Sequence, residues 1–410
     1  MGSDLQSETM IRDARASAAT RRLNILHLVE TYLPLTENWI YPQVRAVPGC
    51  RGTVACRQLV APERFPLEPR RLIQSPPPWG ARTVLPRLIN SLAFRLGRAD
   101  GFVELLARWR PMHVLHAHFG MCGWEWLPLA ARSRRPLVTS FYGYDAWNVP
   151  TQFPEWRERY RQLFAAGTLF LVEGSAMRDR LQHLGCPAEK IHIHHIGVDL
   201  ADLPFARRDF TRSMKIVMVG RFTEKKGLED GLLACAQAAS RGVDLRVTIV
   251  GGAPDADRAG QKIGATLQAI AAQPSLRDRV RFAGFLPLAE TRQLLQQHDI
   301  FLCPSRHAAN GDAEGGSPVI LTEAMAAGLV CVGTDHCDIP ELIIPERTGY
   351  RCPERDVAAL AHLLEAAHQV GAGNSAIAAA GRAHVEAEYS LATQLAEKRR
   401  LYERVAAAHP

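Results

Sequence analysis

Residues 214–252 read MKIVMVGRFTEKKGLEDGLLACAQAASRGVDLRVTIVGG, and this stretch decides the fold class. It begins with the apolar run MKIVMVG (214–220), continues through the amphipathic pattern GLEDGLLACAQAASRG (227–242) and ends in a second apolar run, LRVTIVGG (245–252). Short apolar runs separated by helical patterns are typical of parallel strands joined by crossover helices. The stretch therefore predicts a buried parallel sheet with helices packed on its faces.

The same alternation extends along nearly the whole chain. Seven further runs have the length and apolar character of buried strands: LNILHLV (23–29), MHVLHAHF (112–119), PLVTSFYG (136–143), TLFLVEG (168–174), RVRFAGF (279–285), DIFLCPS (299–305) and LVCVGT (329–334). Helical patterns such as LAETRQLLQQ lie between them. The sequence therefore predicts an α/β protein with two doubly wound parallel sheets, one in each half of the chain.

The predicted domain boundaries fall where this alternation lapses. Pro, Asp and Arg gather in IGVDLADLPFARRDFTRS (196–213), as expected of a linker. The predicted parts are a disordered polar segment (1–20), a first domain (21–200), a linker (201–213), a second domain (214–385) and a C-terminal helix (386–410) that packs back on the first domain. Open parallel sheets bind ligands at the carboxyl ends of their strands, so we expect a ligand cleft between the two domains.

Composition limits the compartment. The 410 residues contain no apolar run near the roughly 18 residues that would span a bilayer, and the first residues lack the apolar stretch of a signal peptide. The nine cysteines are scattered and never form a C-x-x-C pair, which favours a reducing compartment and argues against a disulfide or zinc framework. We expect a cytoplasmic protein, soluble or peripheral on the inner face of the cytoplasmic membrane.

The positive charge is concentrated in the first domain. Between Arg51 and Arg98 there are nine Arg and two Glu, a surplus of seven that equals the net charge of +7 for the whole chain. Within this region, the Pro-rich segment 61–90 is predicted to be an insertion or long loop. The helical pattern RTVLPRLINSLAFRLGR places five apolar side chains on one face: Leu85, Leu88, Ile89, Leu92 and Leu96.

Two interpretations of this basic helix are open. The first, which we favour, is a surface helix docked on its own domain. The second is an amphipathic element that binds an anionic membrane or a phosphate-bearing acceptor, with Arg87, Arg95 and Arg98 on its other face. Nucleic acid is not expected as a partner, because the basic residues are not interleaved with aromatic residues and no binding motif accompanies them.

Neither half of the chain has the signature of a redox dinucleotide site. The segment LVETYLPLTENW (28–39) contains no glycine, and VGRFTEKKG has a spacing different from G-x-G-x-x-G. In VGRFTEKKG, Gly220 and Arg221 directly follow the strand and Lys226 comes five residues later. Two cations at the end of a strand suit a diphosphate, because fixed positive charges offset the negative charge of such a leaving group. A solvated turn is the simpler alternative.

The stretch EGGSPVILTEAMAAG (314–328) carries two glutamates around an apolar run. Ser317 is predicted to be the N-cap of a helix with Pro318 in its first turn, and Gly328 to close it. The glycines before the helix let backbone N–H groups approach an anion. Glu323 falls on the inward face of this helix, so its carboxylate needs hydrogen-bond donors, and a ribose diol would supply two. Glu314, in the loop, would reach sugar hydroxyls.

These segments resemble the retaining glycosyltransferases of family 4, which have the GT-B fold of two Rossmann-like domains. The resemblance covers roughly residues 21–405 and is strongest in GRFTEKKG, DIFLCPS, EGGSPVILTEAMAAG, GTDHCDIPELI and RTGY. It implies that Glu314 contacts the donor sugar, Glu323 the ribose, and Arg221 and Lys226 the diphosphate. One difference is that eight residues separate the two glutamates, where the family usually has seven.

The resemblance also implies further donor contacts and an activity. The donor-binding set would be Gly220, Phe285 near the base, Gly315, Gly316, Ser317, Pro318, Val319 and Glu323. The chain would transfer a sugar, with retention of configuration, from a nucleotide diphosphate sugar to a hydroxyl of a glycan or a polyprenyl-diphosphate-linked acceptor, in exopolysaccharide or cell-envelope glycan synthesis. An epimerase of the same fold, or a non-catalytic nucleotide-sugar binder, remains an alternative.

In the first domain, LHAHFG (115–120) resembles the family's His-x-His-Phe segment, which implies that His118 lies near the reacting centre. His116 is interpreted instead as a satisfied core residue. SFYGYDAW (140–147) resembles the family's T-F-H-G-x-D, with Tyr142 in the histidine position and Asp145 matched. The segment PLTENWI resembles a Ser-Glu-Thr-Phe-Ile segment of exopolysaccharide enzymes, which makes Thr36 and Glu37 candidates for acceptor or phosphate contacts.

No cofactor and no metal are expected. The alternating His192 and His194 have no Cys or carboxylate partner at ligand spacing. The pair Asp255 and Asp257 looks like an Asp-x-Asp metal motif but lies in a polar loop after VGGAP. The resembled family generally holds its diphosphate with Arg, Lys and a helix dipole, and not with a bound cation.

Overall fold

The computed structural model describes residues 22–34, 37–75, 84–95, 100–109, 112–210 and 213–409. The predicted disordered segment 1–20 therefore lies outside the described residues. The chain divides into two compact units, each of which is described by itself. The first comprises Met1–Ser140, Ala165–Phe170 and Leu395–Pro410, and the second comprises Phe141–Phe164 and Leu171–Gln394.

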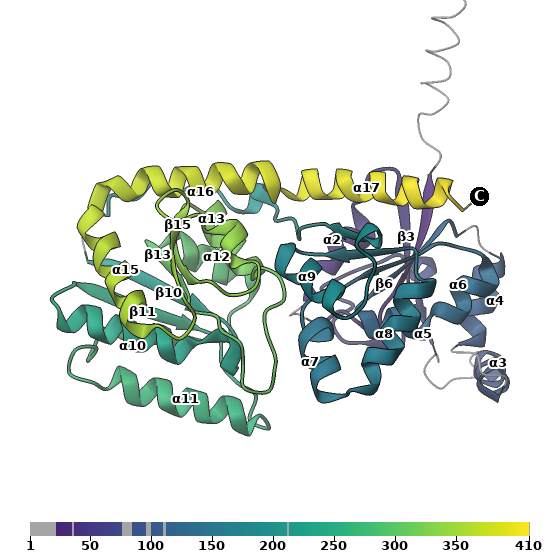
Figure 1. The fold of residues 1–410 in the computed structure, drawn as a ribbon, viewed down its shortest axis with the longest axis horizontal. Coiled ribbons are helices and arrows are strands. Elements are labelled where there is room, and N and C mark those ends of the chain that lie inside the picture. Colours follow the sequence, from purple (N-terminus) through teal and green to yellow (C-terminus); the bar gives the residue numbers. More distant parts are fainter. Residues whose placement is uncertain are drawn as a thin grey trace, which may run out of the picture. The chain divides into compact units, whose positions relative to one another are not determined.

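A seven-stranded sheet is built from the first half of the chain (Figure 1). Its strand order is β5-β3-β1-β6-β7-β8-β9, and β1 pairs in parallel with both β3 and β6. The strands are β1 (Leu23–Leu28), β3 (Cys50–Cys56), β5 (Leu72–Gln74), β6 (Val114–His118), β7 (Leu137–Ser140), β8 (Leu169–Val172) and β9 (Ile191–Ile193). A separate short parallel pair joins β2 (Thr31–Tyr32) to β4 (Gln58–Leu59).

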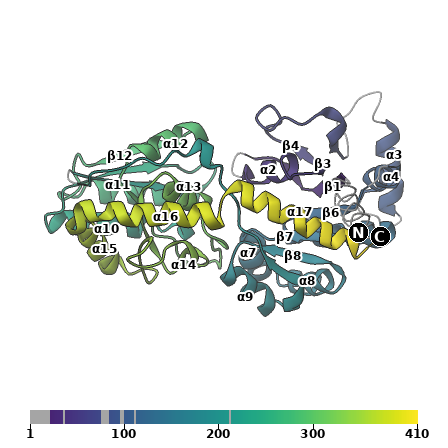
Figure 2. The same cartoon turned by 90° about the horizontal axis from the view of Figure 1, so that it is seen from above.

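Helices follow most of these strands, as crossover connections between parallel strands require. They are α2 (Ile40–Arg45), α3 (Val84–Arg95), α4 (Gly101–Trp109), α5 (Gly120–Glu125), α6 (Leu127–Ser133), α7 (Tyr144–Gln152), α8 (Glu155–Ala166) and α9 (Ser175–His183). The last helix, α17 (Leu391–Ala407), crosses the strands of the first unit from Leu395 onward (Figure 2). There the Tyr402 hydroxyl contacts His116 Nδ1 at 2.6 Å, and buried Lys398 donates to Gln43 Oε1.

A six-stranded parallel sheet forms the centre of the other half, in the order β12-β11-β10-β13-β14-β15. Its strands are β10 (Met214–Val219), β11 (Leu245–Val250), β12 (Val280–Gly284), β13 (Ile300–Cys303), β14 (Val330–Thr334) and β15 (Gly349–Cys352). Its helices are α10 (Leu228–Ser240), α11 (Arg258–Ala271), α12 (Leu288–Gln296), α13 (Val319–Ala326), α14 (Ile339–Leu342), α15 (Val357–Val370) and α16 (Asn374–Glu388). Short 3-10 turns at η2 (Pro69–Arg71), η4 (Ala188–Lys190), η5 (Leu200–Asp202), η6 (Glu224–Lys226) and η7 (Gly371–Gly373) complete the described elements.

Both faces of the six-stranded sheet are covered. Alternate strand residues divide between two cores, because successive side chains of a strand point to opposite faces. Ile216 and Met218 of β10 pack with α10, α11 and α15, whereas Val217 packs with α12, α13, α14 and α16. Figure 1 shows α10 and α11 on one side of the sheet and α13 and α16 on the other. The predicted fold class, two doubly wound parallel sheets, is confirmed.

The nine strands expected from apolar runs are all present, and β9 is the strand on which His192 and His194 were expected to alternate. Five strands were missed and one was misjudged. Strand β3 has the unremarkable sequence CRGTVAC yet lies inside its sheet between β5 and β1, and the other missed strands, β2, β4, β5 and β15, have two to four residues each. Strand β12 was expected to be buried and is instead an edge strand, with Phe282 exposed. The segment 61–90 was expected to be a loop or insertion, but β5 within it pairs with β3.

The basic helix is docked on its own domain, as the favoured interpretation expects, because Asn90 of α3 donates to Ser75 Oγ at 2.8 Å and to Asp100 Oδ2 at 3.2 Å. The leucine face does not make this contact: Leu85, Leu88 and Leu92 are 68%, 62% and 61% exposed, so they do not pack on the described part of the domain. Ile89 is half-buried, and Leu96 lies outside the described residues. Among the described helices, none has both the length and the apolar character needed to cross a membrane.

Candidate functional site

Most donor-binding residues expected from the sequence lie in the loops after β10 and β13 and in helix α13, at the carboxyl-terminal end of the six-stranded sheet, and the loop after β14 lies beside them. These loops hold residues 220–227, 304–318 and 335–338. In an open parallel sheet this end is where ligands bind, because the loops and the helix N-termini face it. The strand order places β10, β13 and β14 side by side, which brings segments nearly 100 residues apart into one site.

The loop after β10 holds Lys226 in a tight turn. Gly227 has a φ of +59°, and a Cβ atom there would lie 1.8 Å from the carbonyl oxygen of Pro304, so only glycine fits. A Cβ atom on Gly220 would meet the Lys226 side chain at 3.1 Å, which shows that the lysine stem packs over that glycine. Arg221 is exposed, and its side chain makes no hydrogen bond or ion pair with the described residues.

The Glu314 carboxylate is held from two sides. Lys226 Nζ lies 2.8 Å from its Oε1 and 3.0 Å from its Oε2, and Ser305 donates to Oε1 at 2.9 Å. Burial alone would raise the pKa of this carboxyl, but the charges of Lys226 and Lys225 and the hydrogen bond from Lys226 lower it to about 2. The side chain expected to reach sugar hydroxyls is therefore ionised and already paired with the lysine expected to bind the diphosphate.

Helix α13 begins one residue later than expected. Pro318 occupies the N-cap position, and Ser317 donates its hydroxyl to the carbonyl oxygen of Asp338 at 2.6 Å, so the prediction of Ser317 as N-cap is wrong. The amides at the start of α13, from Val319 onward, are not capped by the side chain of Pro318. Gly315 precedes them with a φ of +88°, and Gly316 follows it, which gives the turn the backbone freedom expected from the sequence.

The donors for Glu323 come from the protein. Its side chain is only 5% exposed, and Arg292 of α12 donates to its Oε1 from Nη2 at 2.6 Å and from Nε at 3.1 Å. The expected need for donors is met within the protein, and the contact of Glu323 with a ribose diol stays a prediction. Burial raises the pKa of the Glu323 carboxyl, and the guanidinium of Arg292 opposes that shift. Arg292 also donates to Asp202 at 2.7 Å.

Phe285 directly follows strand β12, at the carboxyl-terminal end of the same sheet. Its ring is 61% exposed, and a Cβ atom on Gly252 would approach it to 3.1 Å. The ring thus covers the glycine that follows β11. An exposed aromatic ring over a glycine-lined turn offers a flat apolar surface beside the backbone, as expected for a base contact.

Three polar residues of this site were missed in the sequence. Arg292 lies in an ordinary amphipathic helix pattern, and Ser305 follows a strand as many serines do. Lys225 is buried and donates to the carbonyl oxygen of Ala313 at 3.0 Å and to Asp312 at 3.2 Å. The adjacent pair of lysines was the only available signal, and it did not show which one would turn inward.

His118 is fully buried in the first unit. Its Nε2 lies 3.0 Å from Nδ1 of His27, and its ring lies 4.3 Å from that of His116. Burial holds the pKa of His118 well below its usual range and lowers that of His27 to about 3, so both rings are neutral. His116 contacts Tyr402 and Ser140 with its two ring nitrogens, which confirms its interpretation as a satisfied core residue.

The other acceptor-side residues are placed separately. Thr36 lies outside the described residues, and the amide of Glu37 donates to the carbonyl oxygen of Pro34 at 2.9 Å. Asp145 is buried in the first turn of α7 and accepts a hydrogen bond from the amide of Tyr142 at 2.9 Å. This contact shapes the turn before α7, and Tyr142 itself is half-buried.

Two groups of side chains in the described ranges have metal-ligating atoms within 4.8 Å of one another. They are the buried cluster His27, His116 and His118, and the cluster His307, His336 and Cys337. Asp257 caps α11 by accepting from the amide of Gly260 at 3.0 Å, and His194 contacts the carbonyl oxygen of Gln394. The absence of a metal remains a prediction.

Comparison with known proteins relates this geometry to one family. Residues 213–369 match the family described as "Glycosyl transferases group 1", and residues 53–202 match "Glycosyltransferase Family 4". The chain is 37% identical over 260 residues to a protein of Escherichia coli K12 named as a colanic acid biosynthesis glycosyltransferase, WcaL. It is 36% identical over 284 residues to the amylovoran biosynthesis glycosyltransferase AmsK of Erwinia amylovora. These matches cover 63% and 68% of this chain, and 62% and 66% of the relatives, so the chain spans slightly less than two thirds of their length.

Solved structures show the same fold at low sequence identity. The sucrose-phosphate synthase of Thermosynechococcus elongatus superposes with a TM-score of 0.73 at 17% identity, over 94% of this chain and all of that one. Anabaena Alr3699/HepE, in complex with UDP and glucose, gives a TM-score of 0.70 at 17% identity, over 93% of this chain and all of the other. These solved structures show that the chain has the GT-B fold. The two family matches and the two relatives show that it belongs to glycosyltransferase family 4.

Proposed function

We propose that this chain transfers a sugar from a nucleotide diphosphate sugar to a hydroxyl of a glycan or lipid-linked acceptor, with retention of anomeric configuration and without a metal. The observation that carries the proposal is the contact between Lys226 and Glu314. It brings the cation expected at the diphosphate within 2.8 Å of the carboxylate expected at the sugar. A ligand that joins a diphosphate to a sugar would present both complementary groups at this point.

The chemistry would rest mainly on electrostatic stabilisation. Negative charge develops on the departing β-phosphate as the anomeric bond breaks, and Lys226, the exposed Arg221 and the first amides of α13 would stabilise it. The leaving phosphate would accept the proton of the attacking hydroxyl on the same face of the sugar, so retention needs no enzymatic nucleophile. Glu314, held ionised by Lys226, would accept hydrogen bonds from sugar hydroxyls.

The relatives support a pathway and a donor class. WcaL and AmsK are named for the biosynthesis of colanic acid and amylovoran, which supports a role in exopolysaccharide synthesis. The structural neighbour from Anabaena was solved with UDP and glucose, which supports a nucleotide-sugar donor.

Helix α3 supports an acceptor presented at a membrane. Leu85, Leu88 and Leu92 form a row at i, i+3 and i+7 with each side chain more than 60% exposed, and the surrounding sequence has a surplus of seven arginines over glutamates. Apolar side chains beside basic ones are the composition of helices that lie in anionic bilayer surfaces. We therefore place the acceptor on a lipid carrier and the enzyme at the cytoplasmic membrane face.

The proposed binding of α3 to a membrane is tested by cosedimentation with vesicles of phosphatidylglycerol and phosphatidylcholine. Replacing Leu85, Leu88 and Leu92 together by serine is expected to abolish binding to the anionic vesicles. The matched control is Val60→Ser, because Val60 is 54% exposed in the same unit but lies outside α3. Binding that survives the triple substitution, or equal binding to pure phosphatidylcholine, would refute this part of the proposal.

The proposed binding of a nucleotide-sugar donor is tested by calorimetric titration with UDP, GDP and their glucose, galactose and mannose conjugates. Wild-type protein is expected to bind one nucleotide series, and Lys226→Met is expected to weaken it at least tenfold. Lys215→Met is the matched control, because Lys215 lies near the start of β10, at the opposite end of that strand from the loop that holds Lys226. Normal affinity in Lys226→Met, or no binding to any of the ligands, would overturn the assignment.

Product analysis separates the enzymatic alternatives. With the donor that titration selects, transfer is expected only when a lipid extract containing polyprenyl-linked acceptors is added. Conversion of the sugar in the absence of acceptor would instead identify an epimerase. Binding of donor with no turnover under either condition would identify a nucleotide-sugar-binding protein.

A further inference from the structure

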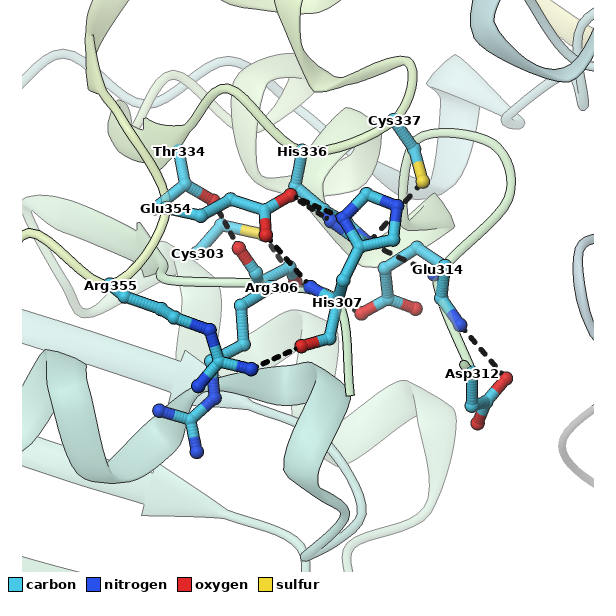
Figure 3. Close-up of polar contacts among 12 residues, drawn as sticks. Cys303, Arg306, His307, Asp312, Glu314, Thr334, His336, Cys337, Glu354 and Arg355 are labelled. Carbon is cyan, nitrogen blue, oxygen red and sulfur yellow. Dashed lines mark hydrogen bonds and ion pairs between the residues drawn. The ribbon is translucent and has the colours of Figure 1, made fainter. Parts of the chain in front are cut away.

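The turn that carries Glu314 is held by a polar side chain from a different loop. His336, which follows β14, is completely buried, and its Nε2 accepts a hydrogen bond from the backbone amide of Glu314 at 3.0 Å. Its Nδ1 lies 2.6 Å from Oε1 of Glu354, which follows β15. Figure 3 shows this chain of contacts, which links the loops after three neighbouring strands.

These partners decide where the His336 proton lies. A carboxylate only accepts hydrogen bonds, so Nδ1 must carry the proton that is shared with Glu354. The Glu314 amide only donates, so Nε2 must be the bare nitrogen. The Sγ of Cys337 lies 3.3 Å from the same Nε2 and is a weak donor, which is compatible with this tautomer.

Glu354 is itself fixed by His307. Its Oε1 contacts His307 Nδ1 at 2.8 Å, and its Oε2 accepts from the backbone amide of His307 at 2.9 Å. Burial alone would raise the pKa of Glu354, but the hydrogen bonds from the His336 side chain and from the backbone amide of His307 lower it to about 2. The carboxylate that orients His336 therefore stays ionised at neutral pH.

The turn needs such an anchor because glycine follows it. Gly315 has a φ of +88° and is succeeded by Gly316, so the backbone after Glu314 has little intrinsic rigidity. Lys225 donates to the carbonyl oxygen of Ala313 at 3.0 Å, which belongs to the same peptide group as the Glu314 amide. His336 and Lys225 thus fix both polar atoms of the peptide that joins Ala313 to Glu314, while Lys226 and Ser305 hold the Glu314 carboxylate.

We propose that His336 is a positioning residue: oriented by Glu354, it fixes the backbone of Glu314 and so sets the place at which the Glu314 carboxylate meets the donor sugar. The effect on transfer rests on the function proposed above, whereas the anchoring of the turn does not. Loss of one buried hydrogen bond of this kind is worth about 1.4 kcal/mol, which is a factor of about ten in a local opening equilibrium.

The anchoring is tested on ligand-free protein by amide hydrogen exchange. His336→Leu is expected to speed exchange at the Glu314 amide about tenfold, and His336→Gln, which keeps an acceptor at the end of its side chain, is expected to restore part of the protection. The matched control is His298→Leu, which removes another buried imidazole of the same unit that contacts Leu294 and Thr248 and lies outside this chain of contacts. Unchanged exchange in His336→Leu would overturn the anchoring.

The role in transfer is tested with UDP and UDP-glucose, or with the corresponding pair selected by titration. His336→Leu is expected to lower kcat at least tenfold while the affinity for the nucleoside diphosphate changes less than twofold, because that ligand has no sugar. An unchanged kcat beside faster exchange would overturn the positioning role, as would an equal loss of affinity for both ligands. Failure of the wild-type protein to turn over any nucleotide sugar would count against the proposed function and leave the exchange result standing.

A second variant guards against misfolding of His336→Leu. Glu354→Ala removes the group that selects the tautomer while leaving the buried imidazole in place, and Glu354 is partly exposed. It is expected to reproduce both effects at reduced size. If Glu354→Ala leaves both the exchange rate and kcat unchanged, the proposed relay is wrong.

Discussion

Replacing Arg292 by methionine is expected to destabilise the protein strongly, because it leaves Glu323 as an unpaired buried carboxylate. Methionine keeps an unbranched apolar stem and removes two hydrogen bonds, at 2.6 Å and 3.1 Å, to a carboxylate that is only 5% exposed. Breaking a buried ion pair on one side typically costs about 3 to 5 kcal/mol. The lost contact to Asp202 adds little, because that side chain is 59% exposed.

The loss is expected to depend on pH in a defined direction. In the variant the lowering effect of Arg292 is gone, while burial and the charge of Asp202 still raise the pKa of Glu323. Its pKa in the folded state therefore lies above the ordinary glutamate value of about 4.3 that applies to the unfolded chain. Between these two values the folded state binds more protons than the unfolded state, so stability falls as pH rises through this window. The deficit relative to wild type is therefore larger at pH 8 than at pH 5.

Thermal unfolding followed by far-ultraviolet circular dichroism measures this effect. A loss of about 3 kcal/mol corresponds to a decrease in Tm of at least about 6 °C for a domain of this size. Arg279→Met is the matched control, since its partner Asp244 is 65% exposed and the pair should contribute little. Equal shifts in the two variants, or a larger deficit at pH 5, would refute the reasoning.

Three further changes have definite expected outcomes. Burial lowers the pKa of Lys398 to about 7 in the folded state, whereas the lysine of the unfolded chain stays protonated up to about pH 10. The free energy of unfolding of the wild type is therefore expected to rise between pH 7 and 10, and urea unfolding of Lys398→Met should lack this rise. Gly227→Ala is expected to lower stability by at least about 2 kcal/mol, seen as a reduced urea midpoint, because its Cβ would clash with the Pro304 carbonyl at a positive φ. Asp257→Ala is expected to cost about 1 kcal/mol through loss of the α11 cap, whereas Asp255→Ala should leave the melting temperature unchanged.

The sequence predicted the fold well because its strongest signals are local. Alternation of apolar strands with amphipathic helices is visible in any window of about 30 residues, and parallel sheets buried on both faces give near-continuous apolar runs. Strand β3 was not predicted because CRGTVAC has neither a long apolar run nor alternation. Its burial comes from the neighbouring strands β5 and β1 on its two sides. Its place in the sheet is a property of tertiary packing.

The position of the candidate site was also predictable, whereas its internal contacts were not. Lys226, Glu314 and Glu323 stand in recognisable segments, and strand order alone brings those segments to one edge of the sheet. The partner of Glu323 depends on which face of α12 meets α13, and this decides that Arg292 is its donor. An arginine at one of several polar positions of a helix carries no local mark of such a role.

The anchor at His336 shows the same limit. The residue lies in a segment recognised as similar to the family, but its function depends on the Glu354 carboxylate 18 residues later and on an amide 22 residues earlier. Backbone amides are present at every residue other than proline, so no side-chain pattern could reveal this contact.

The contact between Lys226 and Glu314 also makes the ligand-free site internally neutralised. A simple anion that draws Lys226 away would leave a buried carboxylate without its cation, and this cost offsets most of the attraction. A ligand that supplies an anion for the lysine and hydroxyl donors for the glutamate satisfies both groups at once. The ion pair is therefore expected to disfavour binding of inorganic phosphate and to permit binding of an intact sugar diphosphate. Abundant free phosphate in a cell is then expected to compete poorly with the donor.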